Sequence, residues 1–381
     1  MKLKTIPILF AFLVMGVADA MGPLSDAVKN QYQLSNVLAT LLTFFVFIAF
    51  AVFSVPGGLI AARIGKKKLL LTGLALNIIA MGVPTFFNPG FALLLACIFL
   101  LGVGTTFLQV AGNPIMRDVS EEGSYSRNLA LAQGLKGVGS SGSSLLVGAV
   151  LLIPFVAQMG WRGVFPVFFI FMVITFILVA TQKIDETKAD VPPGIGSSLS
   201  LLKKPVFALA VLGIFLYVGA EASMGRFLKP TLQSFGITTD TAALLGPALF
   251  FGALTFGRLV AGVVKVSPRA FFRISAALGV LGIILLMFGQ KELSLAGVVL
   301  GGLGFANIWP MLFSITVEEK PEAANELSGL MCMAISGGAI VPLIMGRFTD
   351  LGFGSFSYIV PFICFAYLLL LSLRGGKKTA Q

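Results

Sequence analysis

The chain lacks histidine entirely and has only three cysteines among its 381 residues. Histidine is the commonest metal ligand and the usual proton carrier near neutral pH, so its absence argues against both kinds of site. Cys97, Cys332 and Cys364 lie inside apolar runs and show neither paired nor metal-ligand spacing. We therefore expect no metal and no cofactor, and any proton chemistry should use carboxylates.

Charged residues are also scarce. They make up 11% of the chain, against about 25% in an ordinary soluble domain, whereas 57% of the residues are hydrophobic. So apolar a composition indicates that lipid surrounds most of the chain. The net charge of +11 does not indicate nucleic-acid binding, because the positive residues lie in short loops between apolar runs.

Apolar segments long enough to cross a bilayer recur along the whole chain. A helix needs about 20 apolar residues to cross ~30 Å of hydrocarbon. We predict an all-α membrane protein, whose basic N-terminus leads into a retained first helix rather than a cleaved signal peptide. The twelve predicted spans are Ile6–Leu24, Asn36–Ala62, Leu69–Phe87, Phe91–Met116, Leu129–Phe155, Val164–Thr181, Val206–Leu228, Thr241–Val264, Phe272–Gly289, Leu293–Val317, Glu326–Thr349 and Tyr358–Leu373.

A polar segment with a Pro-Pro pair, Gln182–Lys204, separates six spans from six more. We predict a six-helix bundle over 1–181, a flexible cytoplasmic linker over 182–204 and a second bundle over 205–381. Most of the 27 Lys and Arg residues fall in segments that would lie on the same side of the membrane as the linker. Because positive residues favour the cytoplasmic side, we predict that both termini are cytoplasmic. We expect a monomer in a bacterial-type inner membrane, and two such halves are typical of secondary transporters.

Two glycine- and arginine-containing segments follow the second and the eighth span. They are GLIAARIGKKK, from Gly58 to Lys68, and GRLVAGVVKVSPR, from Gly257 to Arg269. Positive-inside anchoring explains the charges, but the corresponding positions in the two halves also suit a cytoplasmic gate.

The first segment resembles the signature loop of the major facilitator superfamily, Gly-x-Leu-Ala-Asp-Arg-x-Gly-Arg-Lys. The signature aspartate is replaced by Ala62, so the gate contact that this acid makes in the family is not expected here. The resemblance implies a gating role for the matching residues, which are Gly58, Arg63, Gly65, Lys66 and Lys67. Arg258 is expected to share this role because of its corresponding position in the second half.

Further motifs are similar to those of the fucose–proton symporter family within that superfamily. They are VAGNPIM from Val110, NLALAQGLKGVG from Asn128, LYVGAEASMG from Leu216, and the helix from Glu326 to Asp350. The resemblance implies a two-bundle transporter that moves a sugar by alternating access, coupled to a cation such as a proton or sodium. It also implies that Gln109, Asn113 and Gln133 bind sugar hydroxyls.

Gln109 occupies a position where the proton-coupled sugar symporters have a glutamate. An amide keeps the hydrogen bonding but cannot carry a proton. Coupling should then use Asp19 or Glu221, or another cation, or be absent. Asp19 could instead be a hydrated acid near the membrane surface, and Glu221 a structural partner of a neighbouring helix.

Lys136 lies one turn after Gln133 in the fifth span, where the family has a neutral residue. Its side chain could reach back to the cytoplasmic surface, but that surface is on the order of 10 Å away. The following GVGSSGSS favours close helix packing and an interior lysine. Its counter-charge would be Asp19, Glu221 or an anionic substrate such as a sugar acid.

Asn307 and Trp309 lie in the tenth span beside Pro310. A tryptophan in a polar cavity can stack on a sugar ring, although anchoring at the membrane surface is an equal alternative. No nucleophile–base pair and no soluble signalling domain is recognisable in the sequence, so we expect neither an enzyme nor a receptor.

Overall fold

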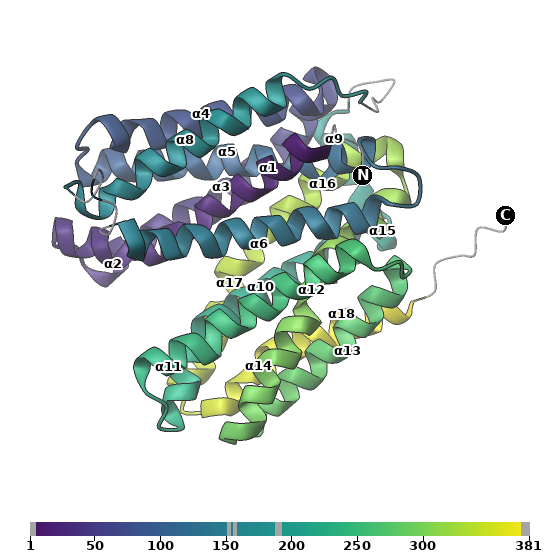
Figure 1. Cartoon of the computed structure of the whole chain (residues 1–381). Helices are drawn as coiled ribbons and strands as arrows, with labels where there is room; N and C mark the ends of the chain where they lie inside the picture. Colours follow the sequence, from purple (N-terminus) through teal and green to yellow (C-terminus); the bar gives the residue numbers. More distant parts are fainter. Residues whose placement is uncertain (1–4, 151–153, 155–157, 187–192, 375–381) are drawn as a thin grey trace. The chain divides into compact units, whose positions relative to one another are not determined.

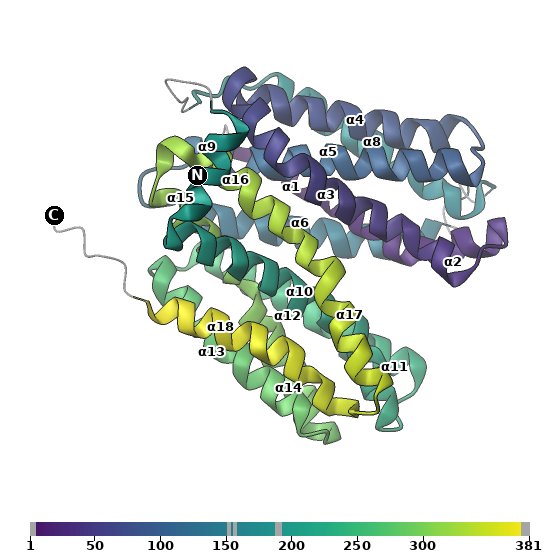
Figure 2. The same cartoon turned by 180° about the vertical axis from the view of Figure 1, so that it is seen from behind.

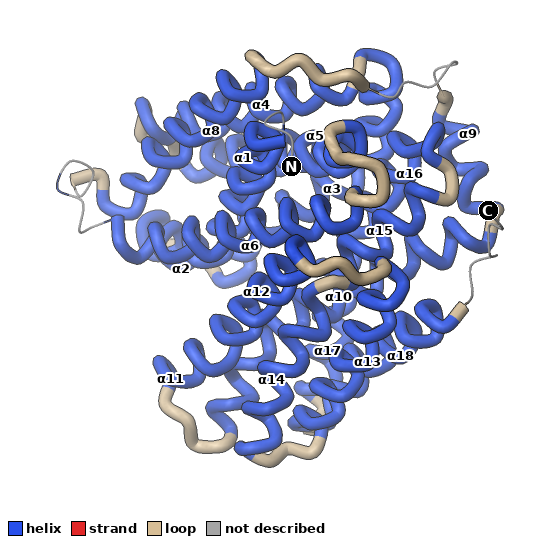
Figure 3. Tube along the Cα trace, turned by 45° about the vertical axis from the view of Figure 1, so that its right-hand side comes forward, coloured by secondary structure: helices blue, strands red, loops and turns tan. Residues whose placement is uncertain are grey.

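The computed structural model describes residues 5–150, 154, 158–186 and 193–374. Within these ranges the chain forms helices and connecting loops and no strand (Figure 3). In chain order the first elements are α1 (Ile6–Met15), η2 (Gly16–Ala20), α2 (Met21–Tyr32), α3 (Asn36–Ile64), α4 (Lys66–Phe86), α5 (Phe91–Asp118), α6 (Tyr125–Ala149), η4 (Gly160–Gly163), α8 (Val164–Ala180) and α9 (Ile195–Ser200).

The remaining elements are η5 (Leu201–Lys203), α10 (Pro205–Ser234), α11 (Thr239–Ala243), η6 (Leu244–Ala248), α12 (Leu249–Val263), α13 (Pro268–Met287), α14 (Lys291–Ala306), α15 (Ile308–Glu318), η7 (Pro321–Ala323), α16 (Ala324–Met333), η8 (Ala334–Ser336), α17 (Gly337–Asp350), η9 (Gly354–Tyr358) and α18 (Ile359–Leu373).

Helices occupy all twelve predicted spans, which confirms the fold class. In the described part of the chain, 10 helical segments are long and apolar enough to cross a membrane, and Ile6–Ala20 is a shorter apolar helix. The remaining span is α6, which is 25 residues long but carries Lys136 and a run of serines and glycines. The predicted end of that span, at Phe155, falls beyond α6 and includes positions 151–153 and 155, which lie outside the described residues.

Several spans are interrupted rather than continuous. The first contains the 3₁₀ segment Gly16–Ala20, the tenth breaks at Asn307 between α14 and α15, and the eleventh contains the 3₁₀ turn Ala334–Ser336. A 3₁₀ stretch inside a longer helix often marks a hinge or a functional site. Two of these breaks coincide with polar residues singled out in the sequence, namely Asp19 and Asn307.

The chain divides into two compact units. The first comprises Met1–Asn128, Leu135–Ser200 and Lys320–Met333, and the second comprises Leu129–Gly134, Leu201–Glu319 and Ala334–Gln381. The predicted linker is partly helical, since α9 and η5 lie within it, and its residues 187–192 are outside the described ranges.

In the first unit α4 packs against α5 and α8, which lie beside it in Figure 1, and α16 packs against α3 and α5. The contact between α3 and α16 depends on glycine, because a side chain on Gly58 would come within 2.6 Å of the Asn325 carbonyl oxygen. In the second unit α10 packs against α17 and α18, as Figure 2 shows, and α14 packs against α12 and α13.

α6 and the start of the chain approach each other closely enough for backbone contact. A side chain on Gly139 would collide with the carbonyl of Leu13, and one on Gly16 would meet the Lys136 carbonyl oxygen at 2.6 Å. The prediction that the glycine- and serine-rich stretch packs against another helix is confirmed. The contact fixes η2, and with it Asp19, beside α6.

Candidate functional site

Two amide side chains lie in the interior of the first unit, on α5. Gln109 and Asn113 are one turn apart, and they are 1% and 0% exposed. The Gln109 Nε2 donates to the Asn113 Oδ1 at 3.5 Å, and the Asn113 Nδ2 donates to the Cys332 Sγ at 3.9 Å. Two of the three predicted sugar ligands therefore belong to one buried polar cluster, and Cys332 of α16 joins it although its sequence context did not single it out.

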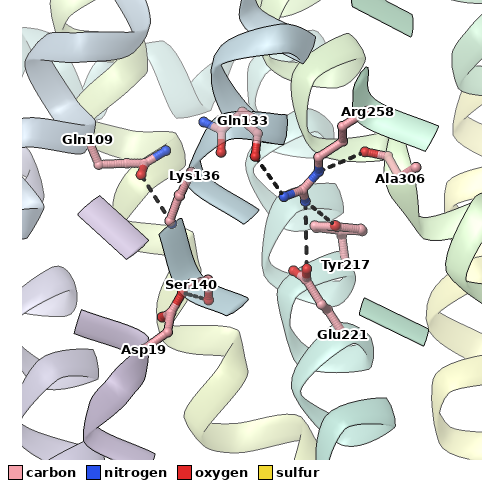
Figure 4. Close-up of polar contacts among 9 residues, drawn as sticks. All are labelled: Asp19, Gln109, Gln133, Lys136, Ser140, Tyr217, Glu221, Arg258 and Ala306. Atoms are coloured by element: carbon pink, nitrogen blue, oxygen red, sulfur yellow. Dashed lines mark hydrogen bonds and ion pairs between the residues drawn. The ribbon is translucent and has the colours of Figure 1, made fainter. Parts of the chain in front are cut away.

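The ammonium of Lys136 reaches this cluster from α6. Its Nζ donates to the Gln109 Oε1 at 3.3 Å, and the side chain is half-buried (Figure 4). Within the described residues of this unit, no carboxylate forms an ion pair with Lys136. The lysine thus points to the α5 amides inside the unit, as the interior interpretation requires.

Asp19, in η2, contacts α6 at a different residue, Ser140, which lies one helical turn after Lys136. The Ser140 hydroxyl donates to its Oδ2 at 2.6 Å, and the rest of the Asp19 side chain is exposed. Ser140 was absent from the predicted site, although its position four residues after Lys136 places both on one helix face. Asp19 was one of three alternatives for the counter-charge of Lys136, and these two described residues form no ion pair with each other.

A second polar cluster lies in the second unit around Arg258. We expected Arg258 in a cytoplasmic segment, but it lies inside α12 and is 7% exposed. Its guanidinium donates to the Tyr217 hydroxyl at 2.9 Å, to the Ala306 carbonyl at 3.0 Å and, from Nη1, to the Gln133 carbonyl at 3.5 Å. Glu221 faces the same guanidinium at 3.6 Å (Figure 4).

These contacts give Glu221 a partner on a neighbouring helix, since it lies on α10 and Arg258 on α12. The arginine also contacts Tyr217, one turn before Glu221 on α10, and this residue was not predicted from the sequence. A buried arginine that contacts one acid and several neutral acceptors is a structural arrangement that joins these neighbouring helices.

Asn307 and Trp309 lie at the break between α14 and α15, and both are buried. The Asn307 Nδ2 donates to the Gly257 carbonyl at 3.3 Å, whereas its Oδ1 and the Trp309 Nε1 have no hydrogen-bond partner among the described residues. Trp309 stacks on Phe313 with ring centroids 5.9 Å apart. Buried polar atoms without partners are costly, so these two atoms are suited to a polar ligand.

The chain matches the family model of the Major Facilitator Superfamily over residues 8–343. The chain belongs to this superfamily. It is a multi-pass membrane protein, and several of its relatives are named as transporters.

Among the relatives is a "Glucose/galactose transporter" of Brucella abortus, 28% identical, with 92% of this chain and 88% of the relative aligned. An "L-fucose-proton symporter" of Escherichia coli K12 is 24% identical over 94% of this chain and 90% of its own length. The solved structure of an E. coli fucose:proton symporter variant aligns with a TM-score of 0.83 at 19% identity, covering 97% and 98% of the two chains. This likeness establishes the fold.

The superfamily's signature loop joins α3 to α4 at Gly65, whose φ of 97° favours glycine. The next residue, Lys66, forms an ion pair with Asp118 at 2.5 Å, and both side chains are almost completely buried. The backbone N–H groups of Lys66 and Lys67 donate to the Glu186 carboxylate at 2.6 and 3.0 Å. Two acids, Asp118 of α5 and Glu186 of the predicted linker, thus contact this loop, in which Ala62 stands at the place of the signature aspartate.

The other signature residues differ in their surroundings. Lys67 donates from its Nζ to the carbonyls of Ala180, the last residue of α8, and of Gln182 just after it. Arg63 is exposed near the end of α3. Neither Asp118 nor Glu186 was predicted to be part of this group, because both are more than fifty positions away in the sequence.

Proposed function

We propose that the protein is a secondary active transporter that moves a sugar or sugar derivative across the membrane by alternating access. The observation that carries this proposal is the near full-length similarity to transporters named for glucose, galactose and fucose. It is supported by the buried amides Gln109 and Asn113, because paired amide donors and acceptors suit sugar hydroxyls. The two six-helix halves would rock around the bound sugar.

Gln133, Asn307 and Trp309 complete the proposed set of substrate ligands. The Trp309 Nε1 and the Asn307 Oδ1 have no hydrogen-bond partner among the described residues, so they offer one donor and one acceptor. A tryptophan face adds stacking with the apolar side of a sugar ring.

We propose Asp19 as the carboxylate that couples transport to a proton. Gln109 cannot titrate, and Glu221 is already paired with Arg258. Asp19 is exposed and is held by one neutral hydroxyl, so it can exchange a proton without breaking an ion pair. Sodium is the alternative coupling ion.

The proposed setting is a bacterial-type inner membrane with both termini in the cytoplasm, and the proposed functional unit is a monomer. The two halves, 1–181 and 205–381, are proposed as the moving bundles. The signature-loop residues Gly58, Arg63, Gly65, Lys66 and Lys67 would belong to the cytoplasmic gate.

Counterflow in proteoliposomes tests this function directly. Vesicles loaded with unlabelled galactose, glucose or fucose are diluted into a trace of the labelled sugar. We expect transient accumulation of label for at least one of the three, and loss of pH-driven uptake in Asp19→Asn with counterflow retained. Absence of counterflow for all three sugars, and for galacturonate loaded in the same way, would contradict the proposal, and uptake driven by sodium alone would replace the proton.

A further inference from the structure

Lys136 places a full positive charge in a membrane helix with little to balance it. Removing an ammonium from water costs several kcal/mol unless an opposite charge or several hydrogen bonds compensate. An ammonium has three N–H donors, and the described residues of the first unit account for one of them, through Gln109. The half-buried ammonium therefore has donors and a charge that an anion could satisfy.

The neighbouring acid is not placed to supply that anion. Asp19 accepts from Ser140, one turn further along α6, and forms no ion pair with Lys136. Its position is fixed by the backbone contact of Gly16 and Gly139 with the opposite helix. The groups that Lys136 does face, Gln109 and then Asn113, are neutral amides.

The direction of the Lys136 side chain is not that of a lysine that extends to the membrane surface. A side chain that reaches the surface ends among exposed groups, whereas the Lys136 ammonium ends on an amide that is 1% exposed. The charge is therefore directed to the interior of the unit, where the proposed sugar ligands Gln109 and Asn113 lie.

We propose that Lys136 binds a carboxylate of the substrate, so that the transported compound is a sugar acid of the hexuronate class. This inference rests on the proposed transport of a sugar derivative and specifies the charge of that compound. The ammonium holds the carboxylate, and the adjacent amides of Gln109 and Asn113 bind ring hydroxyls. Lys136 is then the residue that selects acidic over neutral sugars.

Galactose and galacturonate differ mainly by the carboxylate at C6, so they form a matched pair of probes. Binding of each to the purified full-length protein is measured by thermal stabilisation over a range of ligand concentrations. We expect galacturonate to bind the unaltered protein at least about 10-fold more tightly than galactose. In Lys136→Gln the galacturonate affinity should fall about 30-fold or more, as when one partner of a buried charge pair is removed, with galactose binding retained.

Lys68→Gln is the matched control, since it removes an exposed lysine and should leave both affinities unchanged. Galactose binding without galacturonate binding in the unaltered protein would overturn the inference and leave the proposed function intact. Absence of binding by both sugars, with no counterflow, would count against the function itself.

A second variant separates substrate binding from an internal counter-charge. If Lys136 balances Asp19 in another state of the cycle, Lys136→Gln should lose galactose and galacturonate binding alike, and Asp19→Asn should restore both in the double variant. That rescue would overturn the inference. A loss confined to galacturonate, unchanged by Asp19→Asn, supports it.

Discussion

The ammonium of Lys136, on α6, donates to the side-chain carbonyl of Gln109, on α5, at 3.3 Å. An amide oxygen satisfies one donor of the ammonium without neutralising its charge. The pair therefore leaves a positive charge beside the buried amides of α5. Substitutions that change the charge at Lys136 or at Gln109 therefore test whether this charge recognises the substrate.

Substitution of Gln109 by Glu should give Lys136 an internal carboxylate partner. The new carboxylate would pair with Lys136 and would repel the carboxylate of an anionic substrate. We therefore expect galacturonate binding to weaken about 10-fold or more. Galactose should lose less. Competition between the two sugars in counterflow measures the change, and Gln109→Met, which removes the amide without adding charge, is the control. An equal change of preference in both variants would rule out a charge effect.

The glycine contact between α6 and α1 should be sensitive to a single methyl group. Gly139→Ala would force the new Cβ against the Leu13 carbonyl, and overpacking of this kind costs about 1–3 kcal/mol. Gly142→Ala, three residues further along the same helix, meets nothing within 4 Å and should be neutral or slightly stabilising. Melting temperatures of the two variants in the same detergent compare them, and equal values would show that the contact is looser than described.

The buried cluster around Arg258 should contribute far more to stability than an exposed ion pair in the same unit. Arg258→Met leaves Glu221 without its cation, and breaking a buried pair costs about 3–5 kcal/mol. Arg269 pairs with Glu319 at 3.1 Å, with side chains 52% and 41% exposed, and its loss should cost about 0–1 kcal/mol.

Thermal unfolding of Arg258→Met and Arg269→Met in one detergent measures this difference. Adding Glu221→Gln should recover part of the loss in the first variant, because it removes the unpaired acid. Equal losses in the two arginine variants would mean that Arg258 is not held by the contacts described for it.

The signature loop should be stabilised by Asp118 in place of the acid absent at Ala62. Asp118→Asn removes the charge that Lys66 faces in an almost completely buried pair, so we expect a loss of about 3–5 kcal/mol. The double variant Lys66→Met/Asp118→Leu should be much less affected, because an apolar pair leaves no unpaired charge. If the double variant is as unstable as Asp118→Asn alone, the loop depends on something other than this pair.

The fold follows from hydropathy, since helices occupy the described residues of each predicted span. The one relatively polar span, α6, is recognisable because apolar residues still flank its serines. Hydropathy does not locate the breaks at Gly16–Ala20 and Asn307, because a 3₁₀ turn and an α-turn have similar composition.

The polar residues of the site were recognisable, but several of their partners were not. Arg258 was expected near the cytoplasm because arginines close to a helix end usually anchor there, whereas α12 runs on to Val263 and the guanidinium turns to Tyr217. The contacts of Lys136 with Gln109 and of Lys66 with Asp118 join different helices. Periodicity within one helix carries no information about such contacts.

The central proposal is that Lys136 selects acidic over neutral sugars for transport. Initial rates of galacturonate and galactose uptake are measured in the same proteoliposomes, for the unaltered protein and for Lys136→Gln. We predict that the ratio of kcat/KM for galacturonate over galactose exceeds one in the unaltered protein and falls about 30-fold or more in the variant. An unchanged ratio, or galactose preferred by both proteins, would contradict the account.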